Sequence, residues 1–395
     1  MNIGVLHIAA PEEGGAYQYS ENVIKCLKKY DDTNNYILFY TQENYLYHSY
    51  ESDTWKTVFL EDLDDRQVWM TKKFGHFLRL IPFSFNLKSV CGKYYRIKRY
   101  NIDLLYCPTP SLAGYYCQIP YVVTIFDLMQ KYYSEFPERP FLSRLKRNFR
   151  YKLATKHAKL VVADSAGGKE DIIKFYGIPE EKIEIFPGIP ISTVENDDVS
   201  ESFIQSVKKK YNLPDEYIFY PAHLWYHKNH IRLIKALYVL RERHKIQFSA
   251  VFTGSKREAF GDIMRTVKDL RMEGKIKYLG YVSDQEIRAL YKRAMALVMP
   301  TFFGPANIPI WEAFSLGCPV ITSNVYGIPE QVGDAGLLID PRSVEDIADR
   351  IYRLYIDKNL RERLSRKGLD RIKHPGLEYY ARNLIAALNK VGRGE

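Results

Sequence analysis

The sequence predicts an α/β protein with two Rossmann-like domains, each a parallel sheet wound between helices. Short apolar runs alternate with longer amphipathic segments along the whole chain, which is typical of doubly wound sheets. At 188–202 Pro, Ser, Asn and Asp replace the apolar runs, so we expect a linker there. Two facing domains of this kind predict a ligand cleft between them.

The 395 residues suffice for two domains that each bury a core. We expect the first domain at 1–190 and the second at 203–376, with a C-terminal helix at about 377–395 that could pack back on the first. The expected strands are 3–8, 36–40, 104–107, 121–126, 160–163 and 183–186, then 217–222, 248–253, 276–279, 296–299, 320–321 and 336–339. The main expected helices are 17–29, two within 66–99, 141–158, 166–176, 229–243, 259–272, 284–294, 344–357, 360–372 and 377–390. Ser283 and Glu286 have the spacing of a capping box.

The net charge of +10 is unevenly distributed. Arg66 to Asn101 contains nine Lys or Arg and no carboxylate, and Arg139 to Lys159 contains eight more, again without a carboxylate. Two interpretations stay open: solvated helix faces, or a basic-aromatic surface that meets an anionic membrane or a lipid-phosphate acceptor. No nucleic-acid module accompanies the charge, so nucleic acid is not expected as a partner.

The cysteines and the N-terminus indicate the compartment. Five cysteines are an odd number, lie mostly in apolar runs and lack metal-type spacing, which favours reduced thiols. The chain starts with a strand rather than a signal peptide, and no apolar run is long enough to span a bilayer. We therefore expect a cytoplasmic protein. A peripheral position on the inner face of the cell membrane stays open.

The first candidate site follows the strand 296–299. A loop at 302–308 leads into a helix with Pro309 in its first turn, where the missing N–H of proline costs nothing. Such a loop and helix N-terminus at the end of a parallel strand is where α/β proteins hold anions. Glu312, one turn into the helix, can point toward the same place.

The second candidate site follows the strand 217–222. Its loop contains His223, His227 and Lys228, and a helix begins near Asn229, a residue type suited to the N-cap. Cations beside a helix N-terminus suit a diphosphate, and Lys228 is the preferred ligand. No carboxylate or Cys joins the histidines, so no metal is predicted.

Glycines mark three further strand ends. Gly14 and Gly15 could present bare N–H groups to an anion, and Gly254 and Gly280 end strands of the second domain. Tyr281 and Val282 follow Gly280 and could lie against a flat base. Ordinary turns explain each of these features almost as well. Nicotinamide and Walker-type phosphate motifs are absent from the sequence.

In order and spacing these residues resemble the family 4 retaining glycosyltransferases of GT-B fold, over nearly the whole chain. The second domain carries the matching Lys228, YLGYVSD at 278–284, IPIWEA at 308–313, GCPVI at 317–321 and GIPE at 327–330. The first domain carries Gly14-Gly15, TIFDL at 124–128 and ADS at 163–165. The variant FGPANIPIWEA at 303–313 is most similar to bacterial mannosyl- and rhamnosyltransferases of the group 1 type.

The resemblance implies a hexosyltransferase, metal-independent and without a cofactor. It would move a hexose or deoxyhexose, with mannose or rhamnose favoured, from a nucleotide-diphosphate sugar to a glycan or lipid-linked acceptor in bacterial polysaccharide synthesis. GDP-mannose is the favoured donor, and UDP- and dTDP-sugars are the alternatives. The donor would bind mainly the second domain and the acceptor mainly the first.

The resemblance also implies roles for single residues. Lys228, aided by the Gly15 N–H and the helix near Pro309, would neutralise the leaving diphosphate. Glu312 would accept hydrogen bonds from the ribose. The amides of Ala306 to Ile308 and the Asn307 side chain would hold the sugar hydroxyls, and Asp127 would orient the acceptor or the sugar.

Three positions depart from the family pattern. Gly304 stands where the first Glu of a Glu-x7-Glu motif is expected, His223 where an Arg commonly accompanies the Lys, and Phe126 where a His often precedes the Asp. Two other classes of function stay open: a GT-B sugar-nucleotide epimerase, and a non-catalytic membrane-associated partner protein.

Overall fold

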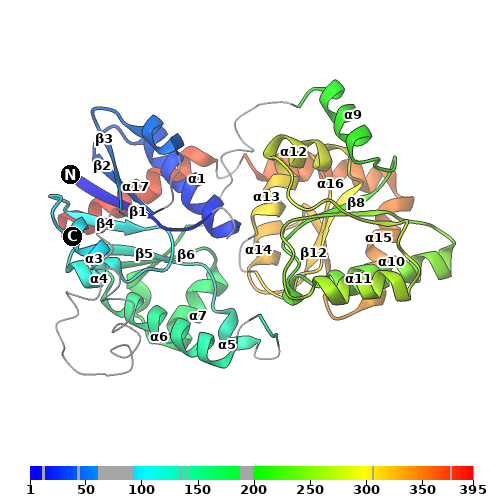
Figure 1. Cartoon of the computed structure of the whole chain (residues 1–395), viewed down its shortest axis with the longest axis horizontal. Helices are drawn as coiled ribbons and strands as arrows, with labels where there is room; N and C mark the ends of the chain where they lie inside the picture. Colours follow the sequence, from blue (N-terminus) through cyan, green and yellow to red (C-terminus); the bar gives the residue numbers. More distant parts are fainter. Residues whose placement is uncertain are drawn as a thin grey trace. The chain divides into compact units, whose positions relative to one another are not determined.

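The computed structural model describes residues 1–10, 14–41, 45–60, 92–133, 136–138, 140–186, 199–304, 307–373 and 376–394. The chain forms two compact units (Figure 1). Unit 1 comprises 1–126, 145–187 and 377–395, and unit 2 comprises 127–144 and 188–376. The segment 127–144 falls inside the range that the sequence analysis assigned to the first domain, but its contacts place it in unit 2.

Unit 1 is built on a seven-stranded parallel sheet in the order β3-β2-β1-β4-β5-β6-β7. The strands are β1 (Asn2–His7), β2 (Asn35–Tyr40), β3 (Trp55–Phe59), β4 (Leu104–Cys107), β5 (Tyr121–Ile125), β6 (Leu160–Ala163) and β7 (Ile183–Ile185). Strands β4, β5 and β6 are buried along their whole length, which explains their unbroken apolar sequence. Chain order reverses between β1 and β4.

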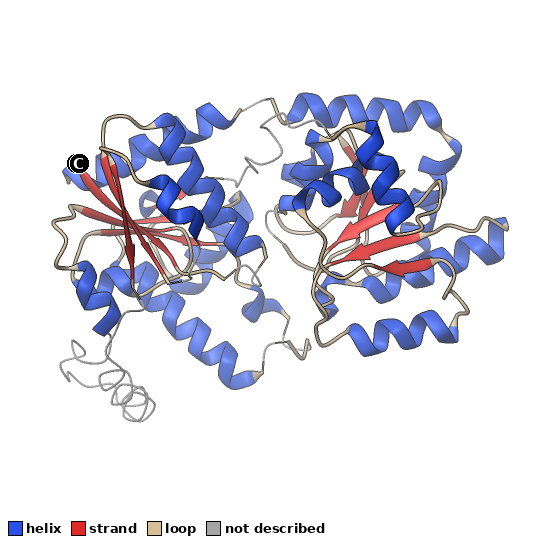
Figure 2. Cartoon of the chain, turned by 45° about the horizontal axis from the view of Figure 1, so that its top comes forward, coloured by secondary structure: helices blue, strands red, loops and turns tan. Residues whose placement is uncertain are grey.

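The helices of unit 1 cover both faces of this sheet (Figure 2). They are α1 (Gly15–Tyr30), η2 (Tyr45–Tyr50), α3 (Gly92–Ile97), α4 (Ala113–Cys117), α6 (Phe141–His157), α7 (Ala166–Tyr176), η4 (Glu180–Lys182) and α17 (Leu377–Arg393), with α6 beginning in the segment 127–144. The C-terminal α17 packs against α1 and β4 (Figure 1). The Tyr19 and Tyr380 hydroxyls lie 3.4 Å apart in this contact, and Asn34 Nδ2 donates to Asn389 Oδ1 at 2.9 Å.

Unit 2 is built on a six-stranded parallel sheet in the order β10-β9-β8-β11-β12-β13. The strands are β8 (Ile218–Pro221), β9 (Ala250–Thr253), β10 (Ile276–Tyr278), β11 (Ala296–Met299), β12 (Val320–Ser323) and β13 (Gly336–Ile339). Numbered within the unit this is the order 3-2-1-4-5-6 of the Rossmann fold, with chain order reversing between β8 and β11. The predicted pair of parallel, doubly wound sheets is confirmed.

The helices of unit 2 also lie on both sides of the sheet (Figure 2). They are α5 (Met129–Tyr132), α9 (Glu201–Lys210), η5 (Tyr226–Lys228), α10 (His230–His244), α11 (Phe260–Asp269), α12 (Asp284–Arg293), α13 (Ile308–Ser315), α14 (Ile328–Val332), α15 (Val344–Ile356) and α16 (Lys358–Arg371). The predicted capping box at α12 is confirmed, because Ser283 Oγ accepts from the Glu286 N–H while the Glu286 side chain accepts from the Ser283 N–H.

The structure adds one strand that the sequence analysis lacked. The edge strand β3 begins at Trp55, whose ring stacks on Tyr36 with centroids 4.4 Å apart. Of the two helices predicted within 66–99, the structure describes only α3, since 66–91 lie outside the described residues. The linker predicted at 188–202 is described only from 199 onward, immediately before α9.

Candidate functional site

The site in unit 2 lies where chain order reverses, at the carboxyl ends of β8 and β11. Open α/β sheets bind ligands at such a switch point because the two loops diverge there and leave a crevice. The loop after β8 contains Lys228, and the loop after β11 leads into α13. The Phe302 N–H donates to the His227 carbonyl at 2.8 Å and thereby joins the two loops.

Asn229 fastens a third loop to these two. It adopts a left-handed conformation with φ 62° at the start of α10, and its side chain makes no capping bond. Instead Nδ2 donates to the carbonyls of Pro300 and Pro341, both at 2.8 Å. The predicted N-cap position is thus occupied by Asn229, but its side chain connects the loops after β11 and β13.

Lys228 is partly buried at the end of η5. Burial lowers the pKa of its ammonium group to about 8, while the carboxylates of Asp127 and Glu138 act in the opposite direction. The ammonium group is therefore still mostly protonated at neutral pH. The structure thus brings two of the predicted site residues, Lys228 and Asp127, within electrostatic reach of each other.

His223 has a defined tautomer. Its Nδ1 accepts a hydrogen bond from the Ser255 N–H at 2.9 Å. Burial, and then the charges of Arg257 and Lys228, lower the pKa of the imidazole, so the neutral ring predominates. The proton consequently sits on Nε2, which makes that atom a hydrogen-bond donor.

The other two histidines of this stretch have separate roles. His227 pairs with Glu138, whereas His230 is 1% exposed and stacks on Tyr220 with centroids 4.6 Å apart. Burial lowers the pKa of His230 to about 3, so it is a neutral core residue. Among the residues that the structure describes, no group of three His, Cys, Asp or Glu side chains could hold a metal ion.

Glu138 is a site residue that sequence reasoning missed. Its Oε1 accepts from both the His227 N–H, at 2.9 Å, and the His227 Nδ1, at 3.1 Å. Burial alone would raise the pKa of this carboxyl, but the hydrogen bonds from His227 and the Tyr226 amide hold it below its usual value. Because an ionised carboxylate only accepts, His227 Nδ1 carries a proton. No local pattern marks Glu138, since its partner lies 89 residues away.

The segment 127–144 also packs its aromatic residues on the loop after β11. The Tyr133 hydroxyl donates to the Phe302 carbonyl at 2.9 Å. The apolar cluster around this bond comprises Met129, Tyr132, Tyr133, Phe136, Phe302, Phe303 and Tyr326. Within it the Phe303 and Tyr326 ring centroids lie 4.3 Å apart and those of Phe136 and Phe302 5.6 Å.

Gly304 and Asn307 contact each other in the loop after β11. Gly304 has φ 152°, and a Cβ added there would overlap the Asn307 side chain. Asn307 Nδ2 donates to the Gly304 carbonyl at 2.9 Å. The Gln331 side chain accepts from the Asn307 N–H at 2.9 Å and donates to its carbonyl at 2.7 Å. Asn307, predicted to hold sugar hydroxyls, thus bonds its own loop, and Ala306 lies outside the described residues.

Glu312 is buried one turn into α13, which begins at Ile308. The Tyr291 hydroxyl lies 3.0 Å from Glu312 Oε2 and 3.2 Å from the Pro309 carbonyl. Burial raises the pKa of the Glu312 carboxyl to about 7, although the Tyr291 hydrogen bond opposes the shift. Glu312 therefore titrates near neutral pH.

The loops after β9 and β10 lie beside each other. The Gly254 N–H donates to the Gly280 carbonyl at 2.8 Å. Gly254 has φ 111°, and a Cβ there would lie 2.8 Å from the Ala222 carbonyl, so the close approach requires glycine. Tyr281 is 87% exposed, whereas Val282 is buried in the core. The Tyr281 ring can therefore meet a ligand, but the Val282 side chain cannot.

Unit 1 has its own switch point after β1. Gly14 has φ 61° and precedes α1, which begins at Gly15. The strand itself ends at His7, which is 1% exposed and whose Nε2 lies 3.0 Å from Glu21 Oε1. The Tyr47 hydroxyl donates to the same carboxylate oxygen at 3.1 Å. The His7–Glu21 pair was also missed, because its members come from a strand and a helix.

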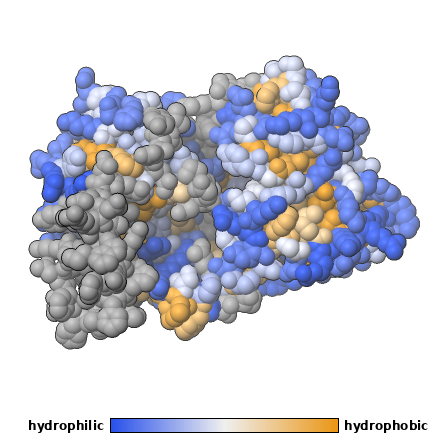
Figure 3. Space-filling view, in the orientation of Figure 1, coloured by the Kyte–Doolittle hydropathy of each residue, from blue (hydrophilic) through white to orange (hydrophobic). Residues whose placement is uncertain are grey.

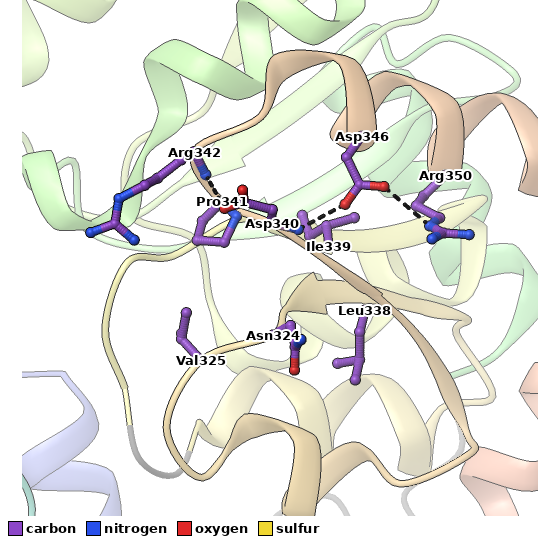
Figure 4. Close-up of a pocket in the computed structure, with 9 residues that line it drawn as sticks. All are labelled: Asn324, Val325, Leu338, Ile339, Asp340, Pro341, Arg342, Asp346 and Arg350. Carbon is purple, nitrogen blue, oxygen red and sulfur yellow. Dashed lines mark hydrogen bonds and ion pairs between the residues drawn. The ribbon is translucent and has the colours of Figure 1, made fainter.

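Figure 4 shows a cavity of about 580 Å³ at the carboxyl ends of β12 and β13. It is lined by Asn324, Val325, Leu338, Ile339, Asp340, Pro341, Arg342, Asp346 and Arg350. Two of its charged side chains form an ion pair, Asp346 with Arg350, and Asp346 also accepts a hydrogen bond from the main-chain N–H of Asp340. None of the predicted site residues lines this cavity.

Comparison with known families covers most of the chain. Residues 202–371 match the family described as glycosyl transferases group 1, and residues 44–189 match glycosyltransferase family 4. The first of these ranges begins at the last residue of the linker predicted at 188–202, and the second ends at residue 189, inside its start.

Curated relatives give a consistent result. The O-antigen chain mannosyltransferase B of Escherichia coli is 32% identical over 226 residues, 55% of this chain and 56% of that protein. The O-antigen chain mannosyltransferase RfbU of Salmonella typhimurium is 25% identical over 358 residues, 86% of this chain and 89% of that protein. The first match therefore spans little more than half of the relative, and the second spans most of it.

Solved structures share the fold. Anabaena HepE in complex with UDP and glucose has a TM-score of 0.72 at 18% identity, covering 99% of this chain and all of that one. The sucrose-phosphate synthase of Thermosynechococcus elongatus has a TM-score of 0.73 at 15% identity, covering 100% of both chains. At these identities the likeness concerns the fold alone. With both family matches, it confirms the predicted resemblance: the chain belongs to the group 1, family 4 glycosyltransferases, and its two parallel sheets have the GT-B fold.

Proposed function

We propose that this glycosyltransferase moves mannose, or a related deoxyhexose such as rhamnose, from a nucleotide-diphosphate sugar to a glycan or lipid-linked acceptor in bacterial polysaccharide synthesis. GDP-mannose is the preferred donor in this proposal. Both O-antigen relatives are named mannosyltransferases, and the variant at 303–313 resembles the same subgroup. The observation that carries the proposal is the position of Lys228 at the switch point of the unit 2 sheet.

Lys228 neutralises the leaving diphosphate in this mechanism. Charge builds on the leaving group in the transition state, where a fixed cation in a partly buried site is most effective. A bound diphosphate raises the Lys228 pKa above its value of about 8 and keeps the ammonium group charged. Within unit 2, His223 Nε2–H and the first turn of α13 supply further donors. No metal ion or cofactor takes part.

The remaining contacts hold the nucleoside and the sugar. Glu312 in its ionised form accepts from the ribose hydroxyls, and the exposed Tyr281 ring lies against the base near Gly254 and Gly280. The sugar hydroxyls accept hydrogen bonds from main-chain N–H groups of the loop before α13, the last of which is that of Ile308. The Asn307 side chain bonds the Gly304 carbonyl of the same loop. Asp127 orients the sugar or the acceptor. The acceptor oxygen bonds to the anomeric carbon on the same face of the sugar from which the nucleoside diphosphate departs, so that the configuration is retained.

A donor screen tests this proposal. Thermal shifts with GDP, UDP and dTDP identify the nucleotide, because a bound ligand raises stability with the logarithm of its saturation. Turnover of GDP-mannose, dTDP-rhamnose and UDP-glucose with lipid-linked and soluble glycan acceptors then identifies the sugar. Stabilisation by GDP and transfer of mannose are expected. Stabilisation by UDP alone would overturn the GDP-mannose assignment.

The same screen separates the alternative chemistry. A sugar-nucleotide epimerase isomerises its donor without an acceptor, whereas a transferase consumes the donor only when an acceptor is present. Incubation of each donor alone, followed by chromatography of the nucleotide sugars, distinguishes the two. Isomerised nucleotide sugar would contradict the proposed transfer.

A surface on α6 favours a membrane-bound acceptor. Phe141, Leu142, Leu145 and Phe149 are each half or more exposed, and helical spacing places all four on one face. The helix has no Asp or Glu but carries Arg144, Lys146, Arg147, Arg150, Lys152 and Lys156. Figure 3 shows exposed hydrophobic side chains where Figure 1 places α6.

We therefore propose that α6 lies on an anionic membrane at the cytoplasmic face. Apolar side chains beside cations, without carboxylates, suit an interfacial helix on anionic lipid. Among the described residues, no helix combines the length and apolarity needed to cross a bilayer. The other basic range, Arg66–Asn101, lies outside the described residues up to position 91, so α6 carries this proposal.

Vesicle flotation tests the membrane proposal. The protein is expected to float with phosphatidylglycerol vesicles and to remain behind with phosphatidylcholine vesicles. The triple variant Phe141→Ser, Leu142→Ser, Phe149→Ser should lose flotation but keep transfer to a soluble acceptor. Ile356→Ser, at an exposed apolar side chain of α15, is the matched control. Self-association through α6, seen as a dimer that the triple variant abolishes, would overturn the lipid assignment.

A further inference from the structure

The segment 127–144 contacts the two loops of unit 2 that are proposed to bind the donor, although it belongs to the first half of the chain. It follows β5 along the chain, yet it packs within unit 2 against both loops of the switch point. Among its described residues are two carboxylates, Asp127 and Glu138, and four of the seven residues of the apolar cluster. Such contacts at a ligand site can determine the position of the groups that bind the ligand.

His227 connects this segment to both loops. On one side its main-chain N–H and its ring Nδ1 reach Glu138 Oε1. On the other side its carbonyl accepts from the Phe302 N–H at 2.8 Å and from Thr301 Oγ1 at 3.2 Å. Because Lys228 is the next residue in the chain, the hydrogen bonds to His227 also place the Lys228 backbone.

A second contact is independent of charge. The Tyr133 hydroxyl donates to the Phe302 carbonyl at 2.9 Å, and both side chains are buried in the aromatic cluster. The Phe302 peptide is therefore held from two sides, by His227 at its N–H and by Tyr133 at its carbonyl. Two residues later the chain reaches Gly304, where the sugar-binding part of the loop begins.

We propose that residues 127–144 form a clasp that positions the donor-binding groups of unit 2, with Glu138 as the positioning residue for Lys228 and Tyr133 as that for the loop after β11. This inference rests on the proposed function for the identity of the ligand, a nucleotide-diphosphate sugar. Both act through the residues that they hydrogen-bond, His227 and Phe302.

The charges around Lys228 make the role of Glu138 measurable. Asp127 and Glu138 are the carboxylates that favour its protonated form, and both belong to the clasp. His223, His227 and His230 also face Lys228, and the pKa of each is lowered, so the rings stay neutral. Among the described residues, removing the Glu138 charge therefore leaves Asp127 as the carboxylate that favours the protonated form of Lys228.

The first experiment measures the pKa of Lys228 without any ligand. Competitive acetylation at a series of pH values, read by mass spectrometry, is applied to the parent protein, Glu138→Gln and Glu138→Asp. In Glu138→Gln the Lys228 pKa is expected to fall by roughly one unit, and in Glu138→Asp most of this shift should be absent. Glu345→Gln, at an exposed carboxylate of α15, is the matched control and should leave Lys228 unchanged.

A Lys228 titration that is the same in folded Glu138→Gln as in the parent would overturn the role of Glu138. Should that variant fail to fold, Asp127→Asn provides the same measurement at the other carboxylate of the clasp, and an unchanged Lys228 pKa there would also refute the inference. Since no nucleotide is present, either result is independent of whether the proposed donor is correct.

The second experiment separates loop position from phosphate binding. Tyr133→Phe keeps the ring in the cluster but removes the hydrogen bond to Phe302. The KM for the nucleotide sugar is expected to rise several-fold, while the Kd of the free nucleoside diphosphate and the pKa of Lys228 stay the same. An unchanged KM would show that Tyr133 does not position the loop. Equal losses for the sugar nucleotide and the free diphosphate would also contradict the proposal.

Discussion

The Tyr291 hydroxyl donates a hydrogen bond to Glu312 Oε2 at 3.0 Å inside unit 2. This contact keeps a carboxyl group that titrates near pH 7 beneath the first turn of α13. A carboxyl with so high a pKa links both ligand binding and stability to pH in the physiological range.

Nucleotide affinity should depend on the charge of Glu312. The ionised carboxylate can accept two ribose hydrogen bonds, so the Kd of the nucleoside diphosphate is expected to rise as pH falls from 8 to 6 through the pKa of about 7. In Glu312→Gln the affinity should be lower at pH 8 and should lose most of this pH dependence. Calorimetric titration at several pH values measures both, and identical profiles in the two proteins would refute the ribose role.

Whereas nucleotide affinity should rise with pH, the stability of the folded protein should fall as pH rises through the Glu312 pKa. The folded-state pKa of Glu312 lies above the ordinary value of 4.5 for a glutamate, so the folded protein holds this proton more tightly than the unfolded chain. Protonated Glu312 contributes to the free energy of unfolding below about pH 4.5, and this contribution is lost as pH rises to about 7. The free energy of unfolding should fall by on the order of 3 kcal/mol over this range. The parent should lose stability as pH rises over this range and Glu312→Gln should not. The thermal midpoint of Glu312→Gln should therefore rise with pH relative to that of the parent. A constant difference would contradict the shifted pKa.

Loss of the Lys228 charge should impair turnover without unfolding the protein. Lys228→Ala is expected to reduce kcat by about 10²- to 10³-fold, the usual effect of removing one fixed transition-state donor. In the parent, activity should also decline above about pH 8 as the free-enzyme Lys228 deprotonates. Lys235→Ala, at an exposed position of α10, is the control. Near-normal turnover in Lys228→Ala would remove the basis of the proposed mechanism.

A side chain at position 304 should disturb the loop after β11. In Gly304→Ala the new Cβ overlaps the Asn307 side chain at a backbone conformation that favours glycine, so stability is expected to fall by about 1–3 kcal/mol. The KM for the sugar nucleotide should rise with it. The double variant Gly304→Ala, Asn307→Gly removes the overlap and should recover part of the thermal midpoint. If the double variant is no more stable than Gly304→Ala, the overlap is not the cause.

Asn229 should be important for stability because two buried carbonyls depend on it. Asn229→Gly retains the left-handed conformation but leaves the Pro300 and Pro341 carbonyls without this donor, which costs about 2–4 kcal/mol. Asn229→Ala adds backbone strain at φ 62° and should be less stable still. Thermal unfolding of the two variants separates these effects, and equal midpoints would show that strain contributes little.

The sequence predicted the sheets well because parallel strands buried on both faces read as unbroken apolar runs. β5, β6 and β11 are wholly buried, and their predicted positions agree with the structure to within one residue. The edge strand β3 was missed because only Trp55 is buried and the other side chains are partly or fully exposed. Exposure at an edge removes the apolar pattern from which a strand is inferred.

Site residues were predictable only where a local pattern marks them. Lys228 and Glu312 each lie in a segment that follows a buried strand, and the sequence around each resembles a motif of the family. Glu138 has no such mark, because its role arises from a partner far away in the chain. Asn307 shows the converse, since the pattern identified its loop but gave no indication that its side chain would bond the Gly304 carbonyl.

The origin of residues 127–144 limits how this enzyme can be recombined. Unit 2 takes these residues from the first half of the chain, while unit 1 takes α17 from the end. An exchange of C-terminal halves between two relatives at the linker would therefore pair a foreign clasp with Phe302, Phe303 and Tyr326. Chimeras designed to change donor preference should therefore exchange 127–144 together with 188–376. The residues that must be exchanged as a set are not continuous in the sequence.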